Sequence, residues 1–368
     1  MPTRIWIARS PSWQTSAASW ASSPSRGTFV SSSASPPRPL LVRLPNWLGD
    51  LVQALPVVAA AAEDPSRRVI FLGPAGFGPL LVPRFPSAEF VPWSRERRFA
   101  AAGALRRARP GAALLLTDSL SSAILAALAL IPDRIGYAAE LRGALLTRRV
   151  PRSAPSRAAP RVEEYAALAR AAGLSVRDPV PRLTALPEER RAAVELLRGV
   201  GRGGAPYAVL APGAAYGPAK RWDPERFAAV ARHLDSRFGV TSILVGTQDD
   251  VVPAAETERM AGGSARSLVD ATDLSTLTGL LAGADLVVSN DSGVMHLGAA
   301  LGRPTVAVFG STSPVWSAAD APWVRNLYAG YPCSPCFRRT CPIGYGCLRS
   351  IQPDEAIRAA GGLIAASS

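Results

Sequence analysis

Three side chains that can bind a ligand or take part in chemistry lie close together near position 290. Asp291, Ser292 and His296 follow Leu286–Val288, a short apolar run typical of a buried strand. A carboxylate, a hydroxyl and an imidazole can hold a polar ligand, and a helix that begins near Gly293 would offer free amide groups to an anion. This segment therefore predicts a binding site for a polar or anionic ligand.

Two of these residues also have a simpler structural interpretation. Asp291 is a good helix N-cap, and capping alone would account for it. His296 falls one turn into the expected helix, beside its apolar face, where a single histidine is often a core residue. The chain has only 2 histidines, and this one lies one turn from the Asp291–Gly293 loop, which favours a role in binding.

The surrounding elements are expected to place this segment at one edge of a parallel sheet. Leu286–Val288 precedes a helix over Val294–Leu301, closed by Gly302, and a second buried strand over Thr305–Phe309. A strand–helix–strand unit implies parallel strands, and ligands of such sheets bind beyond the carboxyl ends of the strands. The polar residues at or just past those ends are Asn290, Asp291, Ser292, His296, Ser311 and Thr312.

The same alternation extends over most of the chain and predicts an α/β fold of two Rossmann-like domains. The expected strands lie at 40–44, 68–72, 89–92, 112–116, 207–210 and 242–245, and the expected helices at 51–62, 96–107, 119–130, 161–172, 188–197, 223–238, 251–260 and 274–281. We expect four parts: a disordered tail over 1–37, one Rossmann-like domain over 38–180, a second over 181–352, and a closing helix over 353–368.

The composition limits the class of protein. The 368 residues suffice for two domains, and the longest apolar stretch, Leu120–Ile131, is too short to span a bilayer. A net charge of +13 indicates an acidic partner, which can be nucleic acid, anionic lipid or a phosphorylated substrate. Lys220 is the only lysine of this arginine-rich chain, which draws attention to the segment around it.

All 4 cysteines lie in one short segment. Cys333, Cys336, Cys341 and Cys347 follow the pattern C-x2-C-x4-C-x5-C. Four thiolates at this density suit a tetrahedral metal ion, zinc before iron, in a structural role. The alternatives are four reduced thiols or two local disulfides. Because the cysteines are not spread as a disulfide framework would be, we expect a reducing compartment.

Four segments together resemble a known family. They are Leu44-Pro-Asn-Trp-Leu-Gly-Asp50, the segment PGAAYGPAKRW at 212–222, the stretch from Val288 through His296 to Pro314, and the cysteine segment. Their order and content are similar to those of the ADP-heptose:lipopolysaccharide heptosyltransferases of glycosyltransferase family nine, and most closely to the type II enzymes. The resemblance covers about residues 40–364 and implies a GT-B fold, in which two Rossmann-like domains face a central cleft.

The resemblance also implies an activity and its partners. It implies an inverting transfer of a heptose from ADP-heptose to the heptose of the lipid A–Kdo inner core, without a catalytic cofactor, in the cytoplasm at the inner face of the inner membrane. The N-terminal domain would bind the acidic glycolipid acceptor, and the C-terminal domain the donor. The remaining partner would be an anionic membrane surface, with no nucleic acid involved, and the arginines that could contact this surface are Arg95, Arg97, Arg98, Arg106 and Arg107.

Such a transfer needs a base for the acceptor hydroxyl and positive charge or hydrogen-bond donors for the leaving diphosphate. Asp50 matches the base of the family, and its alternative is a first-turn aspartate favoured by the helix dipole. Lys220 and Arg221 follow a Gly/Pro loop and can contact phosphates, unless they are a solvated surface pair. The residues expected to bind the donor are Gly213, Lys220, Arg221, Asp250, Asp291, Ser292, Gly293 and His296.

Other functions remain open at this stage. A GT-B sugar-nucleotide epimerase, or a transferase with a different acceptor, would share these motifs. A basic, zinc-binding nucleic-acid protein would account for the charge and the cysteines, although the arginines are scattered through both domains and no nucleic-acid motif occurs.

Overall fold

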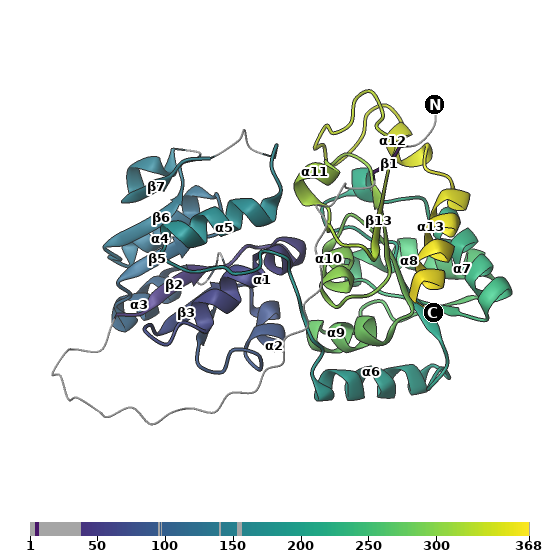
Figure 1. The fold of residues 1–368 in the computed structure, drawn as a ribbon, viewed down its shortest axis with the longest axis horizontal. Coiled ribbons are helices and arrows are strands. Elements are labelled where there is room, and N and C mark those ends of the chain that lie inside the picture. The colour runs from purple at the N-terminus through teal and green to yellow at the C-terminus, as the bar shows by residue number, and fades with distance from the viewer. Residues whose placement is uncertain are drawn as a thin grey trace.

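The computed structural model of the chain contains two β-sheets, parallel except for one edge strand, and each is covered by helices on both faces (Figure 1). It describes residues 4–6, 38–94, 96, 98–139, 141–152 and 157–367. The predicted α/β fold of two Rossmann-like units is confirmed. Among the described residues, no helix combines the length and the apolar character needed to cross a membrane.

The first sheet has 6 parallel strands in the order β4-β3-β2-β5-β6-β7. The strands are β2 (Leu40–Arg43), β3 (Val69–Gly73), β4 (Glu89–Pro92), β5 (Ala112–Leu115), β6 (Asp133–Tyr137) and β7 (Arg148–Val150). Apolar residues pack three helices on one face of this sheet: α1 (Leu48–Ala62), α2 (Gly78–Leu81) and α5 (Arg161–Ala171). Two helices pack on the other face: α3 (Arg98–Ala108) and α4 (Leu120–Leu128). The strand order reverses between β2 and β5, where such sheets bind ligands.

The second sheet has the order β1-β13-β12-β11-β8-β9-β10, and only β1 runs antiparallel to its neighbour. Its strands are β1 (Arg4–Trp6), β8 (Tyr207–Ala211), β9 (Thr241–Leu244), β10 (Ala265–Ser267), β11 (Leu286–Asn290), β12 (Thr305–Phe309) and β13 (Val324–Tyr328). Its helices are α6 (Pro187–Gly199), α7 (Pro224–Phe238), α8 (Val251–Ala261), α9 (Leu274–Gly283), α10 (Gly293–Ala300), α11 (Pro314–Ser317), α12 (Gly346–Arg349) and α13 (Pro353–Ser367).

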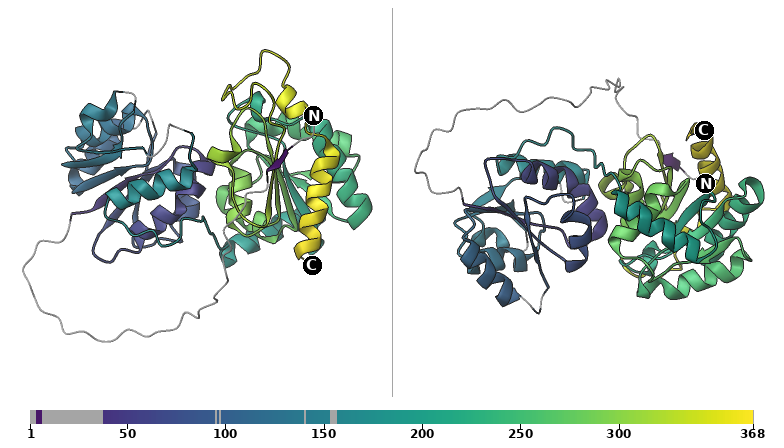
Figure 2. Two further views of the ribbon diagram at one scale, coloured as in Figure 1. Left: turned by 45° about the horizontal axis from the view of Figure 1, so that its top comes forward. Right: turned by 90° about the horizontal axis from the view of Figure 1, so that it is seen from below.

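The structure adds strands that the sequence pattern does not reveal. β6 and β13 are interrupted by polar residues, and β7 is a three-residue strand that contains two arginines. The predicted tail at 1–37 lies outside the described residues except for β1, which pairs with the edge strand β13 (Figure 2). The prediction of a disordered tail is therefore wrong at residues 4–6, because the open edge of β13 offers backbone partners to a segment without apolar periodicity.

Helix α1 begins at Leu48, three residues before the predicted start. Asp50 therefore lies in the first turn of the helix instead of in the preceding loop. The additional residues pack against α10 of the second sheet, where a Cβ on Gly293 would lie 2.7 Å from the Cβ of Leu48. This tertiary contact accounts for the longer helix, which the local pattern could not predict.

A buried ion pair ties the two halves of the chain together. Arg84, which follows α2, donates from Nη1 and Nη2 to the two carboxylate oxygens of Glu189 on α6, at 2.8 and 2.6 Å. The side chains of this pair are only 9% and 1% exposed. Helix α6 packs against α9, which belongs to the second sheet. The ion pair therefore anchors α6 to the residues that follow α2 in the first domain.

We expect Glu189→Gln to lower the free energy of unfolding by about 3 kcal/mol, because the change leaves a buried guanidinium without its counter-charge. The matched control is Glu195→Gln on the same helix, whose partner Arg198 and whose own side chain are 63% and 70% exposed. That change should cost less than about 0.5 kcal/mol. Urea unfolding of the parent and both variants measures the difference, and equal losses in the two variants would contradict the role of the buried pair.

Candidate functional site

The candidate site is a cavity of about 590 Å³ between the carboxyl ends of the two sheets. Of the residues proposed from the sequence, those that line it are Asp50, Gly213, Lys220, Asp250, Asp291, Ser292, Gly293 and His296. Arg221 does not line the cavity; its Nη2 lies 3.7 Å from Oδ1 of Asp250 and so supports the wall from outside. Residues from both domains therefore share a single cavity.

Helices α1 and α10 meet at this cavity through two glycines. A Cβ on Gly49 would lie 2.7 Å from Cδ2 of His296, so the imidazole rests directly on the backbone of α1. The pKa of His296 is lowered to about 4, chiefly by burial; Asp291 opposes this shift and Lys220 adds to it. The imidazole is therefore neutral near pH 7 and acts as a packing surface between the domains.

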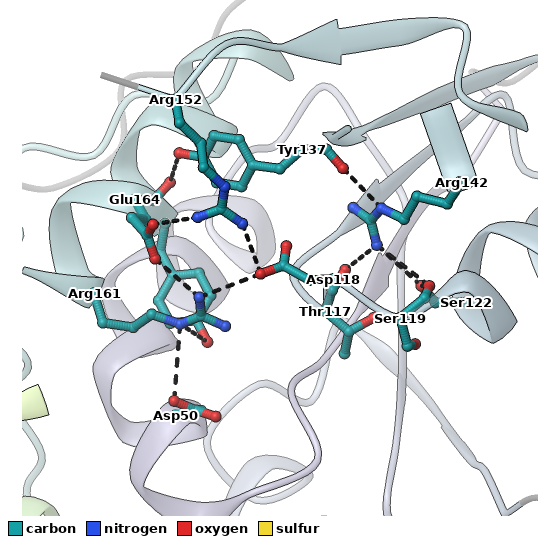
Figure 3. Close-up of polar contacts among 11 residues, drawn as sticks. Asp50, Thr117, Asp118, Ser119, Ser122, Tyr137, Arg142, Arg152, Arg161 and Glu164 are labelled. Atoms are coloured by element: carbon teal, nitrogen blue, oxygen red, sulfur yellow. Dashed lines mark hydrogen bonds and ion pairs between the residues drawn. The ribbon is translucent and has the colours of Figure 1, made fainter. Parts of the chain in front are cut away.

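Asp50 faces a group of charged side chains from its own domain (Figure 3). Oδ1 of Asp50 lies 3.8 Å from Nε of Arg161, the first residue of α5. Burial raises the pKa of Asp50; Arg161 and Lys220 oppose the rise, and Asp291 and Asp118 add to it. A carboxylate with a raised pKa is a stronger proton acceptor, which suits a general base.

Lys220 and Asp291 form an ion pair on the opposite wall of the cavity. Nζ of Lys220 lies 2.7 Å from Oδ2 of Asp291, and the two side chains are 12% and 3% exposed. The same carboxylate oxygen accepts hydrogen bonds from the hydroxyls of Thr312 and Ser317. The suggested capping role of Asp291 is not observed. The N-cap of α10 is Ser292, and the side chain of Ser292 makes no capping hydrogen bond.

Asp250 has one carboxylate oxygen engaged and one without a hydrogen-bond partner. Oδ2 accepts from the backbone N–H and the hydroxyl of Thr247, at 3.0 and 3.1 Å, while the buried Oδ1 has no donor among the described residues. A Cβ on Gly213 would lie 2.0 Å from this Oδ1, so only glycine permits the contact. Asp250 thus has a structural role at the cavity wall, since its carboxylate also serves in the capping box at 247–250.

Asn290 organises the loops on this side of the cavity, a role that the sequence analysis did not assign. Its amide nitrogen donates to the carbonyl oxygens of Pro212 and Gly213, at 2.9 and 3.0 Å, and its oxygen accepts from the backbone N–H of Trp222 at 3.0 Å. One buried side chain thus joins the 212–222 loop to the end of β11. Asn290 lies within the Val288–His296 stretch, and this position is the sequence feature from which its role could have been inferred.

Other residues near Asp50 come from segments without a motif. Arg157 lines the cavity, and its guanidinium carbon lies 5.4 Å from the ring centroid of Trp316 and 4.4 Å from that of Phe337. These are cation–π distances. Arg157 thus links the first domain to aromatic side chains of the second.

The metal centre predicted from the spacing of the four cysteines stays a prediction. Cys333 and Cys336 are exposed, Cys341 is partly exposed and Cys347 is buried, and all four are free thiols. Within the part of the chain that the structure describes, no three His, Cys, Asp or Glu side chains are grouped to hold a metal ion. Charges on Cys333, Cys336 and Cys341 nevertheless contribute to raising the pKa of Cys347, so the four cysteines lie near one another.

The fold and the cavity define a class of protein. Two Rossmann-like sheets whose carboxyl ends face one cavity are the GT-B architecture. The model of glycosyltransferase family 9 (heptosyltransferase) matches residues 98–345, and the chain belongs to this family. It is therefore a glycosyltransferase of the heptosyltransferase type.

Similarity to individual proteins agrees with this assignment. The chain is 31% identical over 296 residues to lipopolysaccharide heptosyltransferase 2 of Escherichia coli K12, which covers 75% of this chain and 83% of that protein. The solved structure of E. coli ADP-heptose LPS heptosyltransferase II has a TM-score of 0.72 at 28% identity and covers 89% of this chain and 99% of that one. The iron-containing dodecameric glycosyltransferase TibC of enterotoxigenic E. coli shares the fold, with a TM-score of 0.58 at 18% identity, over 90% of this chain and 77% of that one.

We expect the thiols to differ in reactivity. Cys333 and Cys336 are exposed, and backbone N–H groups of Ile343 and Tyr345 lower the pKa of Cys341, so these three should react with a thiol reagent in the folded protein. Burial raises the pKa of Cys347, which should react only on unfolding.

A timed thiol titration, with metal analysis of the same sample, tests this expectation. Protection of all four thiols together with one equivalent of zinc or iron would contradict it and would support the predicted metal centre.

Proposed function

We propose that the chain transfers a heptose from ADP-heptose to the heptose of the lipopolysaccharide inner core, on a lipid A–Kdo acceptor, with inversion at the anomeric carbon. The observation that carries this proposal is the shared cavity, to which one domain contributes Asp50 and the other the Lys220–Asp291 pair. The similarity to heptosyltransferase 2 of E. coli supports the donor and the acceptor.

The proposed reaction uses groups that lie on opposite walls. The acceptor hydroxyl attacks the anomeric carbon from the face opposite the diphosphate, and its proton passes to the carboxylate of Asp50. The bond from the anomeric carbon to the diphosphate oxygen breaks, and its electron pair leaves with ADP. Lys220 stabilises the negative charge that grows on this leaving group.

The donor is proposed to lie along the second domain. The N-terminus of α10, at Ser292 and Gly293, presents backbone N–H groups and the positive end of the helix dipole to an anion. Asp250 lines the same cavity, and its carboxylate is proposed to accept a hydrogen bond from a hydroxyl of the ribose or the heptose. Gly213, which also lines the cavity, allows this carboxylate to approach its backbone closely.

Two substitutions should fail in different ways. Asp50→Asn keeps the shape but removes the base, so turnover should fall about 10²- to 10⁴-fold while the affinity for ADP-heptose changes little. Lys220→Ala should weaken donor binding and also slow the transfer step, because a charge-assisted contact to the diphosphate is lost. Calorimetry for donor affinity and single-turnover rates for chemistry separate the two effects.

Lys220→Arg is the matched control, because it keeps the cation and should retain part of the donor affinity. Normal turnover by Asp50→Asn would show that the base lies elsewhere. Unchanged donor binding by Lys220→Ala would show that this lysine does not contact the diphosphate.

We also propose that the enzyme works at the inner face of the inner membrane, held on anionic lipid by α3 and α4. Phe99 and Leu130 are 68% and 73% exposed, and Ile124 and Leu128 are exposed beside them. A groove of about 360 Å³ runs between the two helices, lined by Trp93, Arg98, Ser121, Ile124, Leu125 and Leu128. Exposed apolar groups among cations are typical of surfaces that contact a bilayer.

The charge of this surface supports the same partner. Arg98, Arg106 and Arg107 are exposed on α3, whereas Arg95 and Arg97 of the original prediction lie outside the described residues. Between positions 98 and 130 the only acidic residue is Asp118, and it is paired with Arg152. Each arginine near an anionic membrane contributes about 1 kcal/mol to binding.

We expect Phe99→Ser to weaken binding to vesicles of phosphatidylglycerol and phosphatidylethanolamine about tenfold, because loss of one inserted aromatic ring costs about 1.5 kcal/mol. The control is Val252→Ser on α8, a residue that is 67% exposed in the other domain and should bind as the parent does. Co-sedimentation at two salt concentrations measures both contributions. Equal binding by both variants, or parent binding that added salt does not weaken, would contradict this surface.

A further inference from the structure

The carboxylate of Asp50 is held by charge and not by a hydrogen bond. Within the described residues, its one ion pair is with Arg161, at 3.8 Å from Oδ1 to Nε. That distance exceeds the range of an N–H···O hydrogen bond. The guanidinium therefore supplies an electrostatic field while the oxygen lone pairs of Asp50 remain available to accept a proton.

Arg161 cannot easily turn away from Asp50, because other contacts hold its guanidinium. Nη1 lies 2.9 Å from Oε2 of Glu164, and Nε lies 3.1 Å from the hydroxyl of Tyr165. The ring of Trp316, from the second domain, lies 5.5 Å from the guanidinium carbon. The side chain is only 11% exposed, so solvent screens its charge weakly.

Arg152 holds the acids that surround Arg161. Its Nη2 lies 2.7 Å from Oδ2 of Asp118, and its Nη1 is paired with Oε1 of Glu164. The ring of Tyr137 lies 4.2 Å below its guanidinium, and the hydroxyl of Tyr137 donates to the backbone carbonyl of Glu164 at 2.7 Å. Arg152 thus occupies the two acids that would otherwise compete more strongly for Arg161.

The pairs leave this group with one excess negative charge. Its acids are Asp50, Asp118 and Glu164, and its cations are Arg152 and Arg161. Arg161 lies between Asp50 and Asp118, since its Nη1 is 3.6 Å from Oδ2 of Asp118. The two acids therefore share one cation, and a change in either one alters the electrostatic environment of the other.

We propose that Arg161 is a positioning residue that keeps Asp50 ionised and aimed into the cavity, and that Asp118 opposes it by adding negative charge nearby. This inference rests on the proposed function, in which Asp50 is the base of the transfer. Neither Arg161 nor Asp118 needs to touch the substrate, because both act through the carboxylate of Asp50.

Other charged or titratable side chains also face Asp50, and they come from the elements packed around it. They are Glu164 and Tyr165 on α5, Arg152 and Arg157 before it, Lys220 after β8, and Asp291 and His296 at the start of α10. Lys220 and Asp291 neutralise each other at 2.7 Å, and the pKa of His296, lowered to about 4 by burial, leaves it uncharged. Near neutral pH, removal of Arg161 and removal of Asp118 should therefore shift the pKa of Asp50 in opposite directions.

The test is the pH dependence of the transfer rate for two variants. Loss of the cation in Arg161→Gln removes an influence that lowers the pKa of Asp50, so the acidic limb of the profile should move to higher pH, by about one unit. At acidic pH the transfer rate of Arg161→Gln should be about tenfold lower than that of the parent, and it should recover at higher pH. Asp118→Asn removes an acid that raises the pKa of Asp50, so its acidic limb should move to lower pH.

Three measurements separate positioning from a structural role. Arg161→Lys should restore part of the parent profile, because it keeps the charge. Arg170→Gln, at an exposed position of the same helix, should leave the profile unchanged. The affinity for ADP-heptose should stay constant in all variants, because the donor is proposed to bind the other domain.

The outcomes distinguish this inference from the proposed function. If the parent transfers heptose and Asp50→Asn does not, but neither Arg161→Gln nor Asp118→Asn shifts the profile, the inference is wrong and the function stands. Shifts of the same sign in both variants would also overturn it. If Asp50→Asn is as active as the parent, the proposed base is wrong, and the inference fails with it. Should Arg161→Gln fold poorly, the shift in Asp118→Asn alone decides the question.

Discussion

The close contact between the first turns of α1 and α10 is the constraint on which the site depends. Gly49 lies beneath the ring of His296, and Gly293 beneath the side chain of Leu48, so that a Cβ on either glycine would approach within 2.7 Å of its neighbour. The largest apolar core runs through this contact and includes residues packed on both sheets. The proposed base of one domain and the proposed anion-binding helix of the other are therefore brought to a common cavity.

The charges of the cavity are arranged differently on its two walls. On the side of the first sheet, Asp50 shares Arg161 with other acids and has no hydrogen bond among the described residues; on the other side, Lys220 is paired with Asp291. Each arrangement depends on burial, because solvent would screen pairs of this length. A leaving diphosphate would bring negative charge to the wall that carries Lys220, away from the wall where the proton is accepted.

Much of the fold and part of the site follow from sequence patterns. Alternating apolar runs predict both sheets, and the motifs around Asp50, Lys220 and Asp291 place these residues at the carboxyl ends of strands. Arg161 and Asp118 carry no motif and are distant from Asp50 along the chain. Arg161 meets Asp50 only when α5 packs against α1, and Asp118 follows β5, which pairs with the strand that precedes α1. The metal centre predicted from the cysteine spacing stays a prediction, because the described residues do not group three such ligands in this structure.

The position of a bound acceptor relative to Asp50 tests the central claim most directly. A crystal structure of the enzyme with a slowly reacting fluorinated ADP-heptose and a lipid A–Kdo–heptose fragment would provide it. Our account predicts the acceptor hydroxyl within hydrogen-bond distance of the Asp50 carboxylate and in line with the anomeric carbon, with the diphosphate at Lys220 and the N-terminus of α10. An acceptor hydroxyl that contacts another base, with Asp50 remote from the reacting atoms, would contradict it.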